Sequence, residues 1–125
     1  MVTFSLDGQY VVSANEGEPS EDYSIDPAGS VTIVNLSDGL ENAVVTQVVF
    51  TDFNADGPRA MELPEDVRIF GPNTTVAQDL EPEYVAIAGS QAFVMMQENN
   101  AIAVIDLPTA EVVRIFALGW SVLAA

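Results

Sequence analysis

An internal repeat is the feature of this sequence that most constrains its fold. Residues 1–50 and 83–119 each contain four short segments rich in Val, Ile, Phe and Tyr, separated by turn-forming pairs of Asp, Asn, Gly and Pro. The segment Val31–Leu36 of the first copy aligns with Ile102–Leu107 of the second. Four short antiparallel strands form one blade of a β-propeller. The repeat therefore predicts an all-β fold, a β-propeller segment of two four-stranded antiparallel blades with an irregular insert between them.

The repeat also divides the chain. Within the insert, Arg59–Leu63 follows a proline and predicts one helical turn, Val67–Phe70 predicts a short strand, and the rest is expected to be loop. We expect one partial propeller domain, 1–125, made of a first blade 1–50 with an acidic loop 17–28, an inter-blade insert 51–82, a second blade 83–119 and a tail 120–125.

Composition restricts the chemistry and the partners. There are 19 Asp and Glu residues against 3 basic residues, which gives a formal net charge of -16, and there is no His and no Cys. Nucleic acids and anionic membranes need a basic face, so neither is an expected partner, and a cationic ligand is the natural counterpart. Without His or Cys, any metal site must use oxygen ligands, which suits calcium. No targeting signal and no run of 18 apolar residues is visible.

Several unusual motifs occur in order along the chain, and together they resemble the choice-of-anchor I family of bacterial secreted and cell-surface proteins. They are Ala14–Tyr23, Asp26–Val31, Val67–Pro72, Val76–Tyr84 and Gln97–Ala101. The blade units are also similar to propeller repeats with a YVTN signature. The resemblance implies a larger propeller at the cell surface or outside the cell. A closed propeller needs at least about four blades, so we expect a fragment whose partners are the remaining blades of a larger parent chain.

Acidic and amide side chains are expected to gather at equivalent ends of the strands, where they would form a calcium site. Equivalent strand ends of a propeller converge on one rim, and calcium takes about six to eight oxygen ligands. The alternative is a solvated acidic rim whose side chains cap turns. The candidate metal ligands are Asn15, Glu16, Glu18, Glu81, Glu83, Glu98 and Asn99.

Two further acidic segments have both a calcium and a structural interpretation. The run Asp52–Gly57 matches the first half of a calcium loop, but Leu63 stands where the loop needs a glutamate, so a plain Asx turn competes with it. The loop 17–28 carries four acids that would complete a cation site, face a basic partner or keep the loop soluble. These acids are Glu18, Glu21, Asp22 and Asp26.

These features predict a binding or scaffold module of a secreted or cell-surface propeller, stabilised by a cation. The alternative is part of a calcium-dependent phosphoesterase of the alkaline phosphatase or phytase type, with Glu81 and Glu83 as catalytic carboxylates. No catalytic residue is assigned from the sequence, because no base stands near a nucleophile in a recognised pattern. Whether the chain is an enzyme therefore stays open at this point.

Overall fold

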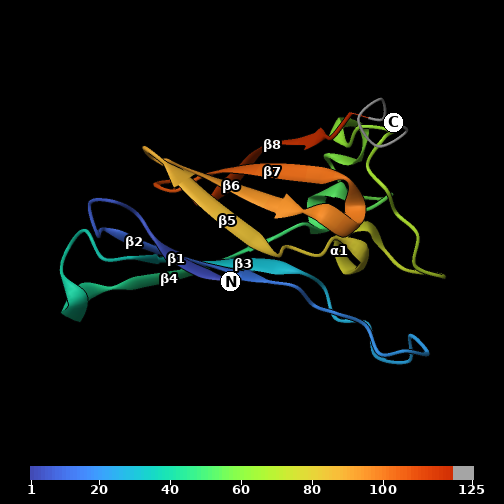
Figure 1. Ribbon diagram of the computed structural model, residues 1–125, viewed down its shortest axis with the longest axis horizontal. Coiled ribbons are helices and arrows are strands. Elements are labelled where there is room, and N and C mark those ends of the chain that lie inside the picture. The colour runs from blue at the N-terminus through green and yellow to red at the C-terminus, as the bar shows by residue number, and fades with distance from the viewer. Residues whose placement is uncertain (120–125) are drawn as a thin grey trace.

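The computed structural model describes residues 1–119, which form two four-stranded antiparallel sheets (Figure 1). The first sheet contains β1 (Val2–Phe4), β2 (Tyr10–Asn15), β3 (Ser30–Asn35) and β4 (Val44–Val49). The second contains β5 (Tyr84–Ala88), β6 (Gln91–Met96), β7 (Ala101–Asp106) and β8 (Glu111–Ala117). Each strand pairs with the next one in sequence. The predicted all-β fold of two four-stranded blades is confirmed, and the predicted tail 120–125 lies outside the described residues.

The segment between the sheets is irregular, with short helical turns. The helical turns in this segment are η2 (Thr51–Phe53), η3 (Ala60–Glu62) and α1 (Val76–Asp79), whereas η1 (Leu40–Asn42) connects β3 to β4 and η4 (Gln97–Asn99) connects β6 to β7. The turn expected within Arg59–Leu63 is present as η3. The prediction of loop around α1 was wrong. Thr75 and Gln78 form a reciprocal capping box there, in which each side chain accepts from the other residue's backbone N–H.

The short strand predicted at Val67–Phe70 is absent. The backbone N–H groups of Phe70 and Gly71 donate to the two carboxylate oxygens of Asp79, at 3.0 and 2.9 Å. Arg68 bonds only to Asn99, through its own N–H and carbonyl. The N–H groups of Val67 and Arg68 donate to the carbonyls of Pro64 and Asn99, and that of Phe70 donates to a side chain, so this segment forms no ladder with a neighbouring strand although its residues have strand-forming propensity.

The two blades pack face to face around one apolar core. The first strands of the blades, β1 and β5, lie against each other, and β2 also contacts β5. In β2, β3, β6 and β7, alternate residues enter this core, as the period of two in β structure requires. Fully buried members include Val12, Val31 and Ile33 from the first blade and Val94 and Ile105 from the second.

The repeat is also visible in the direction that equivalent residues face. Val31 is buried against the second blade, and its repeat equivalent Ile102 lies on the opposite, free face of the second blade. Val11, on the free face of the first blade, corresponds to Val94, which is buried against that blade. Equivalent side chains thus point the same way around a common axis, which is the arrangement of consecutive propeller blades.

Both outer faces of the pair carry apolar rows. On the first blade, cross-strand pairing aligns Phe4, Val11, Val34 and Val45. On the second, it aligns Tyr84, Met95, Ile102 and Phe116. The ends of these rows are exposed, with Phe4 at 65% and Tyr84 at 50% of full accessibility. Contiguous apolar surface of this kind is typical of an interaction face.

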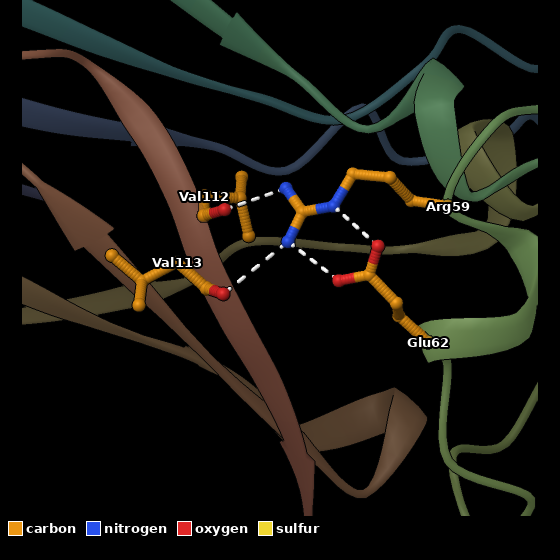
Figure 2. A network of polar contacts seen from close by, with 4 residues as sticks. All are labelled: Arg59, Glu62, Val112 and Val113. Carbon is orange, nitrogen blue, oxygen red and sulfur yellow. Dashed lines mark hydrogen bonds and ion pairs between the residues drawn. The ribbon is translucent and has the colours of Figure 1, made fainter.

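The insert is held against the edge of the second blade by Arg59 (Figure 2). Its guanidinium donates to the carbonyls of Val112 and Val113 at 2.6 and 3.2 Å and pairs with both carboxylate oxygens of Glu62 at 2.9 and 3.0 Å. Consecutive carbonyls of a regular strand point to opposite sides. Here the register of β7 and β8 shifts between Val104 and Ile105, and this bulge lets one side chain reach both.

The insert also touches the first blade closely. The N–H of Gly29 donates to the carbonyl of Ala77 at 3.1 Å, and the side-chain amide of Gln78 donates to the carbonyl of Asp26 at 2.9 Å. A Cβ on Gly29 would overlap the carbonyl oxygen of Leu80 and lie 2.6 Å from Cδ of Pro82. Glycine is needed here for the close approach of two backbones rather than for a turn.

Candidate functional site

Four of the predicted glutamates line one cavity, to which the acidic loop, the end of the insert and η4 contribute. Glu16 follows β2, Glu18 begins the acidic loop, Glu81 precedes β5, and Glu98 lies in η4 after β6. The cavity has a volume of about 370 Å³. We call it the acidic pocket. Its complete lining is Glu16, Glu18, Pro19, Ser20, Glu21, Tyr23, Phe70, Glu81 and Glu98.

Glu81 is the buried member of this group. The residue is only 8% exposed, whereas Glu18 and Glu98 are exposed. Its backbone N–H donates to the side-chain oxygen of Asn99 at 3.0 Å. Its carboxylate makes no hydrogen bond or ion pair with any residue in the range 1–119. A buried carboxylate without a partner is costly in the charged form.

The charges around the pocket reinforce this effect. The pKa of Glu81 is raised to about 7, first by burial and then by the carboxylates of Glu16, Glu98, Asp79 and Glu18. The pKa of Glu16 is also raised, first by burial and then by Glu83, Glu18 and Glu98. Both shifts follow from several negative charges converging on a partly dehydrated space. The arrangement favours any cation that enters.

Asn99 does not line the acidic pocket, and its side chain connects backbone groups instead. Its side chain is fully buried, and its amide donates to the carbonyls of Arg68 and Asp79 at 2.9 and 2.8 Å, and to the Asp79 carboxylate at 3.3 Å. Its oxygen accepts from the N–H of Glu81. The side chain thereby joins the insert, η4 and the start of the second blade.

Asn15 and Glu83 also lie outside the pocket lining. The side chain of Asn15 bonds to Ser13, Ser30 and Thr32 at 2.9, 3.1 and 2.9 Å, which places it in a polar row on the free face of the first blade. Glu83 is half-buried and donates its N–H to the carbonyl of Met95. Its charge acts on Glu16, so it contributes to the field around the pocket.

The acids of the loop 17–28 divide into two groups. Glu18 and Glu21 line the acidic pocket. Asp22 closes its own turn by accepting from the hydroxyls of Ser20 and Ser24 and from the N–H of Ser24, and these bonds lower the pKa of Asp22 to about 2. The pKa of Asp26 is raised by burial and by Asp79. The loop therefore supplies two acids to the pocket and uses a third for its own conformation.

The run Asp52–Gly57 forms turns. The side-chain oxygen of Asn54 accepts from the N–H of Ala77 at 2.8 Å, and its carbonyl accepts from Gly57 at 2.7 Å. Asn54 thus fixes α1 against the insert.

Residues that sequence reasoning did not select complete the acidic pocket. Pro19, Tyr23 and Phe70 give it an apolar and aromatic side. The sequence predicts Phe70 as part of a short strand, and its place in the pocket follows from the irregular conformation of that segment. No basic side chain lines the pocket: Arg59 is held by Glu62, and Arg114 lies over the ring of Phe116 at 4.4 Å.

Within residues 1–119, no group of three or more acidic side chains is close enough to hold a metal ion. The calcium site therefore stays a prediction. In the same part of the chain, no helix is long and apolar enough to cross a membrane.

Comparison with known proteins gives one match. The family model described as the choice-of-anchor I domain matches residues 1–124, nearly the whole chain. Neither the curated proteins nor the solved structures include a match to this chain.

Proposed function

Because the chain belongs to the choice-of-anchor I family, we propose that it serves as a binding and scaffold module at the cell surface or outside the cell, stabilised by a cation. The family description points to a surface-associated domain. The observation that carries the binding role is the acidic pocket. Segments from three parts of the chain bring five glutamates to it, Glu16, Glu18, Glu21, Glu81 and Glu98, and no basic side chain of the described residues lines it.

We further propose that calcium is the stabilising ion. The exposed carboxylates of Glu18 and Glu98 have room to move toward an ion held near Glu81, and calcium accepts such irregular oxygen shells. The test is a circular-dichroism thermal melt at pH 8, in EDTA and then with millimolar calcium. An ion that binds only the folded chain raises the melting temperature. An unchanged melt with calcium, magnesium and EDTA would refute cation stabilisation.

The binding role has its own test, independent of calcium. A basic peptide should bind the chain, and its affinity should fall steeply between 20 and 300 mM salt because exposed charges are screened within about 10 Å at 0.1 M. Binding that is insensitive to salt would contradict an electrostatic interface.

The scaffold role rests on the apolar rows of the two outer faces. We propose that further blades of a larger parent chain pack there, since Ile102 is the repeat equivalent of Val31, which already packs between blades. In their absence these faces should drive self-association. Sedimentation of the chain at increasing concentration should show it, and Phe4→Ser together with Phe116→Ser should weaken it. A strict monomer at high concentration would count against this role.

The phosphoesterase alternative gains no support from the described residues. A phosphate in the acidic pocket would face five carboxylates and no basic side chain, because none of the three arginines lines it. Hydrolysis of a simple phosphomonoester by the chain, abolished by Glu81→Gln, would restore that alternative.

A further inference from the structure

The acidic pocket has room for a ligand larger than the calcium ion proposed above. Its volume of about 370 Å³ lies within the range of small-molecule sites, roughly 300–1,000 Å³. In the part of the chain that the structure describes, no three acidic side chains converge closely enough to hold a metal. The space is thus suited to a cation that carries carbon atoms as well as charge.

The lining offers two kinds of contact. Glu16, Glu81 and Glu98 provide acceptors from three separate segments of the chain. Tyr23 and Phe70 provide aromatic rings, which attract cations electrostatically. A guanidinium matches both, because it is planar, donates in several directions and stacks on rings, whereas an ammonium is a compact and strongly hydrated charge.

Glu81 is the independent sign that the pocket takes a ligand. It is 8% exposed and lines the cavity, yet its carboxylate has no partner among residues 1–119. The Glu81 oxygens reach the open space of the pocket, since no fully buried side-chain oxygen of the described residues lacks a partner, and carboxylates in such largely buried residues are normally paired. An entering guanidinium would supply the missing donors.

We propose that the acidic pocket binds an arginine side chain presented by a partner protein, with Glu81 as its buried anchor and Tyr23 and Phe70 against the guanidinium plane. This proposal rests on the proposed binding function and identifies its site and the chemical class of its ligand. Arginine is preferred over lysine because the site offers rings and several acceptors rather than one carboxylate.

The probes are three blocked tripeptides that differ only in the central residue: acetyl-Gly-Arg-Gly-amide, its citrulline analogue and its lysine analogue. Citrulline keeps the shape of arginine without the charge. Titration of the isotope-labelled chain, followed by amide chemical shifts in NMR, reports both affinity and place. We expect the arginine peptide to bind at least about tenfold more tightly than the citrulline peptide, to bind more tightly than the lysine peptide, and to shift Tyr23, Phe70 and Glu98.

Two variants and one control identify the site. Glu81→Gln should weaken arginine binding about tenfold, and Phe70→Leu should weaken it and reduce the preference over lysine. The control is Glu41→Gln, which makes the same charge change at an exposed turn outside the pocket. Circular dichroism establishes that each variant is folded. The amide of Gln retains the size of Glu81, whose carboxylate has no hydrogen bond to lose.

The outcomes separate this proposal from the broader one. If the arginine peptide binds the wild-type chain and Glu81→Gln equally and in a salt-sensitive way, the acidic pocket is not the arginine site. The electrostatic binding function would still stand. Equal affinity for arginine and citrulline would overturn the charge argument. A calcium-dependent melt without peptide binding would overturn the arginine site and support the proposed calcium stabilisation. Both proposals are overturned if calcium leaves the melt unchanged, basic peptides do not bind in a salt-sensitive way, and none of the three tripeptides binds.

Discussion

Replacing Asn99 with aspartate tests whether this side chain is a structural connector or a metal ligand. Asn99→Asp keeps the size and the oxygen that accepts from Glu81, and removes the amide that donates to the carbonyls of Arg68 and Asp79. It also brings a second carboxylate to the position 3.3 Å from the Asp79 carboxylate. The residue is fully buried, so water cannot replace the lost donors.

The expected loss of stability is large. Each of the two lost bonds contributes about 1 kcal/mol, and the abandoned carbonyls add desolvation costs of about 1 kcal/mol or more each. Two carboxylates 3.3 Å apart repel by about 5 kcal/mol at an effective dielectric constant near 20, so the new group is expected to hold a proton at neutral pH. Because the bonds and carbonyls together come to about 4 kcal/mol and holding the proton at pH 8 adds to this cost, we expect the free energy of unfolding to fall by at least about 5 kcal/mol at pH 8, against about 5–15 kcal/mol for a typical domain.

The assay is urea unfolding followed by circular dichroism at pH 8 and pH 4. The pKa of the new carboxylate is raised in the folded chain, so its penalty grows as pH rises above about 4. Destabilisation should therefore shrink to about 4 kcal/mol at pH 4. Asn42→Asp is the matched control, because Asn42 is exposed and donates one bond at 3.1 Å to the carbonyl of Asp38. An Asn99→Asp chain as stable as the wild type, or stabilised by calcium, would refute the connector role.

Three other substitutions probe the remaining contacts. Gly29→Ala should cost about 1–3 kcal/mol in urea unfolding because its methyl group would overlap the backbone of Leu80, whereas Gly119→Ala, with open space around it, should have no effect. Arg59→Lys should cost about 1–2 kcal/mol because an ammonium cannot make all four bonds of the guanidinium. An unchanged urea midpoint would show that Arg59 does not hold the insert against the second blade. The raised pKa of Glu81, about 7 against an ordinary 4.5, means that wild-type stability falls as pH rises from 5 to 8. The shift corresponds to at most about 3 kcal/mol, which screening by water at the exposed pocket rim reduces to about 1–2. Glu81→Gln should abolish this fall, and parallel pH profiles of the two proteins would show that the group titrates normally.

The strands could be predicted because their signals are local. Turn residues mark each end, as at Asp7, whose carboxylate accepts from the Ser5 hydroxyl and from the N–H of Gln9. The convergence of Glu16, Glu81 and Glu98 could also be anticipated, because equivalent strand ends of two stacked blades must lie at one end of the pair.

The misplaced residues have identifiable physical causes. Ala14 is buried between the blades, so alternation alone sends Asn15 to the opposite face, and this could have been read from the sequence. The position of Asn99 could not, because it depends on η4 folding back against the insert. The apparent strand at Val67–Phe70 failed because the Asp79 carboxylate, nine residues from Phe70, takes its N–H group.

The pairing of every strand with its sequence neighbour has a consequence for folding kinetics. Each sheet is a meander of sequence neighbours whose longest connection is the acidic loop between β2 and β3, so each blade should form rapidly and independently of the other. The contacts between blades span long stretches of chain, such as the 84 residues from Met1 to Val85, and the insert reaches the second blade over the 53 residues from Arg59 to Val112. Docking of two preformed blades would then be the late step. Side chains at the junction, Arg59 above all, should act mainly on the unfolding rate and little on the folding rate.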